Sequence, residues 1–228
     1  MKKFAAICDT STIFNYPPII STLAALGLND RFKTIDIEGE LKLFSSSLEN
    51  YQNKEDVVSL LKKDNVTFDC IYCGNLNKAS DIKIVSDFIT NFKNDNTSVV
   101  INPVLEDDIT SNIDEVRGII SKATVITPSF DLAKKILNLK EDEEVTFEAF
   151  KTWLRELSKM GPKVIIMTDV PDPNHNGEKF DIAYDGETSA YYIIPSCYKK
   201  DAKFNFVDVL TDLIIKDTDL SAVMNQYL

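Results

Sequence analysis

Short apolar runs alternate along most of the chain with segments whose apolar residues recur at helical spacing. A run of four to eight apolar residues is typical of a buried strand, whereas apolar positions three and four apart predict an amphipathic helix. Strands that alternate with helices form βαβ units and a largely parallel sheet. The predicted strands are Phe4–Cys8, Phe32–Ile37, Phe68–Tyr72, Ser98–Ile101, Thr124–Thr127 and Lys163–Thr168.

The helices predicted between these strands follow the same logic. In the segment Ala79–Phe92, five large apolar residues fall on one face of a helix. Pro17-Pro18 opens an earlier helix that runs to Leu26, and Gly27 follows as its C-cap. The remaining predicted helices are Glu55–Lys63, Ile113–Ser121, Leu132–Leu137, Phe147–Lys159 and a last one over Ala202–Lys216.

The pattern changes near the end of the chain. Phe180–Tyr184 and Ala190–Ile194 flank the turn sequence Asp185-Gly186-Glu187-Thr188, which predicts a β-hairpin. We therefore expect an antiparallel hairpin at one edge of a mainly parallel sheet. In open sheets of this kind ligands bind beyond the carboxyl ends of the strands, so the residues that follow each predicted strand are the candidates for a site.

Composition narrows the class of function. The 228 residues carry 25 Lys and Arg against 36 Asp and Glu, a net charge of -11. Such an acidic surface repels phosphate backbones and anionic lipid, which argues against nucleic-acid or membrane partners. The sequence has no apolar run of membrane-spanning length, and we expect a cytoplasmic, single-domain protein over residues 1–228.

Glycine and cysteine exclude several common sites. With 7 glycines, the chain has neither GxGxxG nor GxxxxGK[ST], the loops that usually cradle phosphate. Cys70 and Cys73 form a CxxC motif inside a strand-like run, where their side chains point to opposite faces. We therefore expect no zinc and no iron–sulfur cluster, and we interpret His175, the one histidine, as a solvated loop residue.

Six segments, in order and at about the right spacing, resemble motifs of the pyridoxal/pyridoxamine kinases, a family of the ribokinase superfamily. The segment after the first strand and the helix ending Leu-Gly match the family's opening. Four further segments are similar to its TGYL, DPVM-[GA]-D, AD-[IV]-ITPN and GPK-VVVT motifs, and the hairpin fits its next stretch. In this order the segments are 7–27, Cys73–Leu76, Ile101–Asp107, Ala123–Pro128, Gly161–Thr168 and 183–195.

The resemblance implies a ribokinase-like three-layer α/β sandwich, with helices on both faces of a mainly parallel sheet and an antiparallel edge hairpin. The chain is short at the C-terminus relative to the family. The implied activity is ATP-dependent phosphorylation of the 5′-hydroxyl of a B6 vitamer, with Mg²⁺, in a homodimer. It also implies a nucleotide side formed by Ser129, Thr168 and Asn102, a substrate side formed by Asp9, Ser11 and Asn75, and a metal held by Glu106 and Asp107.

Each of these residues also has an ordinary structural interpretation. A threonine that ends a strand, such as Thr168, fits β-propensity alone. Glu106 and Asp107 fit a solvated acidic loop, and Asp9 fits a cap of the turn that follows its strand.

The departures from the family fall on its chemistry. Where the family has GTGD, whose aspartate takes the proton from the substrate hydroxyl, an ungapped match places Lys200-Asp201-Ala202-Lys203. Gapped matches leave Asp201 or Asp208 as the catalytic candidate, and Asp201 equally fits a helix N-cap.

Other family positions are also changed: Asn becomes Ser129, Glu becomes Leu132, Asp becomes Asn102, and residues 37–42 replace the STHT-like segment. We therefore expect B6 kinase activity that is weak or lost. The alternative is a non-catalytic protein of the same fold, a pseudoenzyme that binds a vitamer, a nucleotide or a partner.

Overall fold

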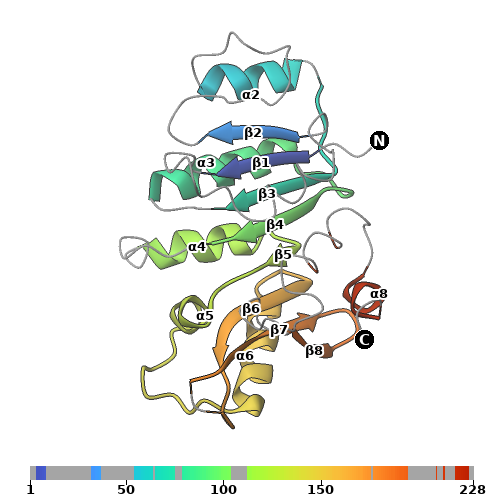
Figure 1. The fold of residues 1–228 in the computed structure, drawn as a ribbon. Coiled ribbons are helices and arrows are strands. Elements are labelled where there is room, and N and C mark those ends of the chain that lie inside the picture. Colours follow the sequence, from blue (N-terminus) through green and yellow to red (C-terminus); the bar gives the residue numbers. More distant parts are fainter. Residues whose placement is uncertain are drawn as a thin grey trace. The chain divides into compact units, whose positions relative to one another are not determined.

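The structure is a computed structural model, and it falls into two compact units, Met1–Glu115 and Val116–Leu228. Figure 1 labels the helices and strands of both units. The residues that the structure describes are 4–8, 32–36, 54–63, 65–74, 79–103, 112–175, 177–194, 209, 213 and 219–225.

The described residues of the first unit form four parallel strands in the order β2, β1, β3, β4. Their bounds are β1 Phe4–Cys8, β2 Phe32–Asp36, β3 Cys70–Gly74 and β4 Ser98–Asn102. The register is even, so that Cys8 lies opposite Asp36 and Gly74, and Gly74 lies opposite Asn102. The carboxyl ends of all four strands therefore meet at one edge, as the alternating pattern predicts.

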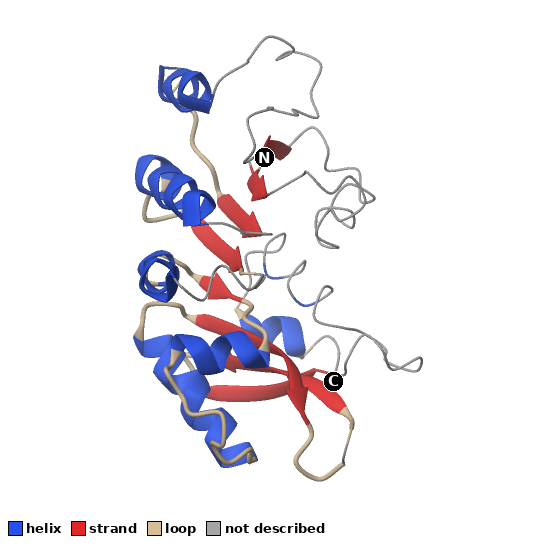
Figure 2. Ribbon diagram, turned by 90° about the vertical axis from the view of Figure 1, so that its left-hand side faces the viewer, coloured by secondary structure: helices blue, strands red, loops and turns tan. Residues whose placement is uncertain are grey.

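Helices of the first unit form a layer of their own beside these strands (Figure 2). They are α2 Lys54–Lys63 and α3 Ala79–Phe92, while α4 Ile113–Ile120 crosses the boundary between the units. The apolar face predicted for α3 is buried, with each of its five large side chains at most 6% exposed. Phe88 and Phe92 pack on Phe68 with ring centroids 5.8 and 5.6 Å away, which closes the core of this unit.

The second unit adds antiparallel pairing to a parallel pair. Strand β5, Val125–Ile126, runs parallel to β6, Val164–Pro171. Strand β7, Lys179–Asp185, pairs antiparallel with β6 and with β8, Ala190–Ile194. The predicted edge hairpin is therefore confirmed, and the start of β7 lies beside the end of β6.

Helices α5, Phe130–Ile136, and α6, Phe147–Lys159, pack on β6. Their contact is aromatic: Phe150, fully buried, lies 5.7 Å from Trp153 and 6.1 Å from Phe130 and Phe180. This cluster fixes one face of β7 against α6.

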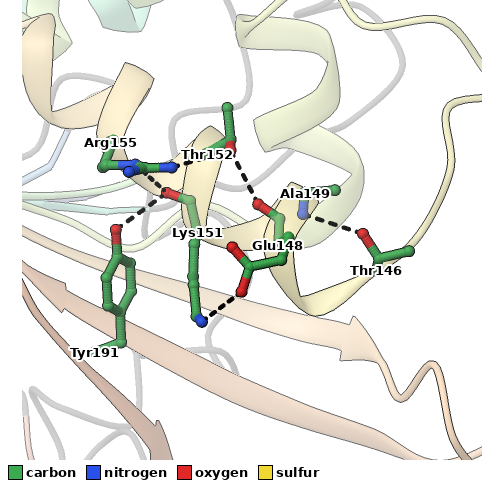
Figure 3. A network of polar contacts seen from close by, with 7 residues as sticks. All are labelled: Thr146, Glu148, Ala149, Lys151, Thr152, Arg155 and Tyr191. Carbon is green, nitrogen blue, oxygen red and sulfur yellow. Dashed lines mark hydrogen bonds and ion pairs between the residues drawn. The ribbon is translucent and has the colours of Figure 1, made fainter.

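The other side of α6 is polar (Figure 3). Thr146 caps the helix, because its Oγ1 accepts the N–H of Ala149 at 3.1 Å. Lys151 Nζ lies 2.7 Å from Glu148 Oε1, and the Tyr191 hydroxyl of β8 donates to the Lys151 carbonyl at 3.3 Å. These contacts hold the helix and the edge strand in place.

Most predicted strands and helices are present, but the bounds of several differ by one or two residues; β3, for example, spans Cys70–Gly74 and not Phe68–Tyr72. Strand β6 continues past Thr168 to Pro171, α5 begins at Phe130 rather than Leu132, and a short helix α8, Leu220–Met224, was not predicted. Of the predicted last helix, Val209 and Leu213 are helical and buried. The predicted helix ending at Leu26 lies outside the described residues. Within the part of the chain that is described, every helix is too short or too polar to cross a membrane.

Candidate functional site

At the strand ends of the first unit, Asn102 and Tyr72 form a side-chain pair. The amide Nδ2 of Asn102 donates a hydrogen bond of 3.1 Å to the Tyr72 hydroxyl. The Tyr72 ring, 3% exposed, crosses over Gly74, where a Cβ would lie 2.8 Å from the ring carbon Cε1. Glycine leaves room for the ring, so the carboxyl ends of β3 and β4 carry a neutral, hydrogen-bonded pair.

In the second unit, the structure brings Ser129 and Thr168 together. The two residues form a parallel β-bridge beyond the regular pairing of β5 and β6, and the N–H of Thr168 donates to the Pro128 carbonyl at 3.0 Å. Ser129 Oγ accepts the N–H of Leu132 at 3.3 Å and so caps α5. Both predicted nucleotide-side residues of this unit therefore lie at one strand end, as their place after β5 and within β6 indicates.

Thr127 adds a buried hydroxyl to this strand end. The residue is 2% exposed, and its Oγ1 has no hydrogen-bond partner in the described part of the chain. Buried polar atoms nearly always have partners, because leaving one unpaired costs about 1–3 kcal/mol. Thr127 is therefore a candidate for contact with a bound molecule or water.

Asp181, near the start of β7, is the buried charge of this region. Its side chain is 5% exposed, and its Oδ1 accepts the N–H of Asp169 at 3.0 Å. Burial raises the pKa of Asp181 to about 6, which the hydrogen bond from Asp169 partly offsets and the negative charge of Asp169 reinforces. At neutral pH the group is therefore a buried carboxylate with a strong need for hydrogen-bond donors.

Strand pairing places this carboxylate opposite the bulged part of β6 that contains Thr168. Phe180 packs on the aromatic rings of α6, so Asp181 and Ala183 fall on the opposite face of β7. Ile166 pairs with Ala183 and Met167 with Ile182, and the register shifts beyond Met167, so Asp181 lies opposite Thr168 and Asp169. We call Ser129, Thr168 and Asp181 the strand-end row.

Most of the other sequence candidates fall outside the described residues. These are Asp9, Ser11, Asn75, Glu106, Asp107, Asp201 and Asp208. The described residues include no group of three or more His, Cys, Asp or Glu side chains that could hold a metal ion. Cys70 and Cys73 are buried in β3. His175 is exposed, and its Nδ1 lies 3.0 Å from Asp172 Oδ2 on a surface loop.

Two residues of the candidate site were missed by the sequence analysis, Tyr72 and Asp181. The signal for Asp181 was a charged residue inside the apolar run Phe180–Tyr184, at a position that alternation assigns to the same face as Ala183. Tyr72 gave no comparable signal, because an aromatic residue in a buried strand is ordinary.

No family model matches the sequence, and no curated protein is similar enough to be matched to it. Solved structures do match. A protein of Bacteroides thetaiotaomicron, assigned as a phosphomethylpyrimidine kinase and crystallised with pyridoxal, is 25% identical with a TM-score of 0.73, over 99% of this chain and 84% of that one.

Two pyridoxal kinases match at lower identity. The enzyme of Bacillus subtilis, solved as an ADP complex, has a TM-score of 0.64 at 17% identity, over 99% of this chain and 88% of that one. The enzyme of Staphylococcus aureus, in complex with AMP-PCP and pyridoxal, has a TM-score of 0.65 at 15% identity, over 98% and 84% of the two chains.

These matches define the class of the fold. Parallel strands with an antiparallel edge, together with their helices, match the ribokinase-like α/β fold of these kinases. The structural neighbours of this chain are phosphomethylpyrimidine and pyridoxal kinases, so the resemblance drawn from its sequence motifs is confirmed.

Proposed function

We propose that this chain is a vitamin-kinase-like protein that binds a B6 vitamer or a related hydroxymethyl pyrimidine together with ATP, and that its phosphoryl transfer is weak or lost. The observation that carries the proposal is the bridge between Ser129 and Thr168 at one strand end. This is where open α/β sheets bind their ligands. The neighbours' crystallised ligands, ADP, AMP-PCP and pyridoxal, support the choice of ligand class.

In this proposal Thr168 donates its hydroxyl to a phosphate oxygen of the nucleotide, and the buried Thr127 hydroxyl gains a partner when the site fills. ATP with Mg²⁺ supplies the phosphoryl group and neutralises its charge. The candidate metal residues, Glu106 and Asp107, lie outside the described residues, so the metal side of the proposal rests on the family resemblance.

Weak transfer follows from the chemistry that the sequence has replaced. Phosphoryl transfer depends on positioning and on electrostatic stabilisation, and loss of one donor typically costs about 10²–10³ in rate. Lys203 stands at the aligned base position and both GTGD glycines are absent. Asp201 and Asp208 remain the candidates for a base, and Asp201 stands at the predicted helix start.

A non-catalytic binding protein is the second candidate, and two contacts favour it. Asn102, at the family's aspartate position, donates its amide N–H to the Tyr72 hydroxyl. The Ser129 hydroxyl oxygen accepts the N–H of Leu132 as a helix cap. Both side chains are then partly committed to the protein's own structure. We also propose that the protein is a cytoplasmic homodimer that binds neither nucleic acid nor membranes. The net charge of -11 supports the last point, because an acidic surface repels polyanions.

Thermal unfolding with each ligand tests the binding part. A ligand at one hundred times its Kd adds about 2.7 kcal/mol of stability, which raises the Tm of a chain this size by about 5–10 °C. We expect pyridoxal to reach that range, and ATP with Mg²⁺ at millimolar concentration to fall well below it. Thr168→Val should reduce the ATP effect, whereas Thr146→Ala, a cap remote in the sequence from the strand-end row, should leave it unchanged.

Turnover tests the catalytic part. We expect pyridoxal phosphorylation far below the ordinary kinase range of about 1–100 per second. A wild-type rate of about 1 per second or faster, lost by 10² or more in Asp201→Asn, would show a working kinase with Asp201 as its base. No shift with pyridoxal and none with ATP would contradict the proposed function altogether.

A further inference from the structure

The end of β6 departs from regular strand geometry at Thr168 and Asp169. The register between β6 and β7 shifts between Met167 and Val170, which marks a β-bulge. Asp169 has a φ of 58°, a left-handed conformation that non-glycine residues seldom adopt. Bulges of this kind redirect one side chain while the strand continues.

Two hydrogen bonds fix the peptide groups on either side of Thr168. The N–H of Thr168 itself is bound by the Pro128 carbonyl at 3.0 Å. The next N–H, that of Asp169, belongs to the peptide plane that carries the Thr168 carbonyl, and Asp181 Oδ1 accepts it at 3.0 Å. Because both planes are held, the backbone angles φ and ψ of Thr168 are set, and with them the direction of its side chain.

The acceptor on the Asp181 side is well suited to that task. The carboxylate is 5% exposed and comes from a neighbouring strand, so it is held by the sheet and not by the bulge that it organises. Lys179 Nζ lies 3.6 Å from Asp169 Oδ1 and holds the Asp169 side chain on the solvent side. Asp169 on β6 is the charged residue that acts on Asp181, and Lys179 on β7 is paired with Asp169.

We propose that Asp181 is a positioning residue: it holds the amide of Asp169, thereby orients Thr168, and so sets the affinity of the strand-end row for the phosphate groups of a nucleotide. The last step rests on the proposed function, because that function makes Thr168 the nucleotide contact. The first step, the orientation of Thr168 by Asp181, concerns only the protein and can be tested without a ligand.

Strand β7 offers a matched control in Asp185. This residue is also buried, at 3% exposed, and lies four residues along the same strand and therefore on the same face. Its Oδ1 accepts the N–H groups of Glu187 and Thr188 at 2.8 and 3.2 Å, in the turn between β7 and β8. A change at Asp185 removes a similar buried carboxylate at the far end of β7 from Thr168.

The first experiment is NMR of the full chain without ligand, with Asp181→Ala, Asp181→Asn and Asp185→Ala. We expect Asp181→Ala to shift the Thr168 methyl signal and to raise hydrogen exchange of the Asp169 amide at least tenfold. Asp181→Asn, which keeps an acceptor oxygen of the same shape, should restore most of both, and Asp185→Ala should change neither. Equal effects of Asp181→Ala and Asp185→Ala on Thr168 would overturn the proposal.

If Asp181→Ala does not fold, the wild type and Asp181→Asn still decide. In the wild type the Asp169 amide shift should follow a single titration as the carboxylate protonates, and this titration should vanish in Asp181→Asn. An Asp169 amide that shows the same pH profile in both proteins would refute the hydrogen bond as the controlling contact.

The second experiment is an NMR titration of the same proteins with ATP and Mg²⁺, which measures even millimolar affinity. Asp181→Ala should raise Kd about tenfold and Asp185→Ala less than twofold. The double change Thr168→Val with Asp181→Ala should bind no more weakly than Thr168→Val alone, because both act through one contact. Additive losses would overturn the proposal. If the wild type binds no ATP, the nucleotide part of the proposed function fails, and the ligand-free comparison still decides on Asp181.

Discussion

The hydrogen-bonded side chains at the strand ends of the two units differ in charge and in the part of the strand from which they come. The described strands of the first unit are all parallel, and the side chains that form a hydrogen bond at the ends of β3 and β4, Tyr72 and Asn102, are neutral. In the second unit an antiparallel strand is added, and it contributes the buried carboxylate Asp181 from the beginning of the strand. A purely parallel sheet supplies this edge only with the carboxyl-terminal residues of its strands, whereas one reversed strand also supplies amino-terminal residues.

The largest expected effect tests whether the two units unfold together. Phe150→Ala leaves a cavity in the core of the second unit, and Phe88→Ala leaves one in the core of the first. Each should lower the free energy of unfolding by about 3–5 kcal/mol. Trp153, the one tryptophan, reports on the second unit. On the expectation of a single domain over residues 1–228, both changes should lower the urea midpoint of Trp153 fluorescence. A midpoint that moves only for Phe150→Ala would separate the units.

The second effect sharpens the contrast in charge. Burial raises the pKa of Asp181 from 3.8 to about 6, so this carboxyl group binds a proton more tightly in the folded chain than in the unfolded chain. The contribution of Asp181 to stability is therefore fully present below about pH 4 and is lost as pH rises through about 6, an amount of roughly 3 kcal/mol at most.

Urea unfolding at a series of pH values measures this contribution. Asp181→Asn should flatten the decline between pH 4 and 6, whereas Asp185→Asn, which keeps Asp181, should retain it. If the free energy of unfolding changes by the same amount over that range in the wild type and in both variants, the burial of a charged Asp181 is contradicted.

The third effect tests the close approach of Gly74 to the Tyr72 ring in the first unit. Gly74→Ala should cost about 1–3 kcal/mol, because its Cβ would lie 2.8 Å from the Tyr72 ring. In a Tyr72→Leu background the same change should cost much less, since the ring is gone. Circular dichroism in urea gives the double-mutant cycle. If the free-energy costs of Gly74→Ala and Tyr72→Leu are additive, the Tyr72 ring is not the reason that position 74 requires glycine.

The smallest effect compares two caps of the second unit. Thr146→Ala and Ser129→Ala each remove an oxygen that accepts a backbone N–H at a helix start, and each should cost about 1 kcal/mol. Only Ser129→Ala should also weaken ATP binding, because only Ser129 belongs to the strand-end row. Equal ligand effects of the two variants would mean that the row has no special part in binding.

The sequence predicted best where local signals act together. Helices Ala79–Phe92 and Phe147–Lys159 have the predicted bounds because apolar spacing extends along each, and the structure adds a cap at Thr146. Helix α8 was missed because its five residues are too short to show a period. The predicted strand ends at Thr168, whereas β6 continues through Asp169. This continuation requires a left-handed conformation at Asp169, which no local sequence pattern predicts.

The candidate site divides in the same way. Asn102, Ser129 and Thr168 follow from motif positions, but their contacts do not. The Asn102 amide meets Tyr72 across 30 residues of sequence, and the Asp169 amide meets Asp181 across a bulged register. Which side chain faces which depends on strand pairing, and pairing is settled by the packing of distant elements and not by the residues nearby.

The loop between β6 and β7 gives the candidate site an entry point for engineering. Its base is closed by the bond from the Asp172 N–H to the Glu178 carbonyl at 2.9 Å, while Pro173, Asn174 and His175 are exposed beyond it. Extra residues inserted there lengthen a closed loop, which costs only about 0.6 kcal/mol for each doubling of its length. A fluorescent or affinity module placed between Asn174 and His175 would thus stand within one short loop of Asp169 and Asp181, and neither strand would be altered.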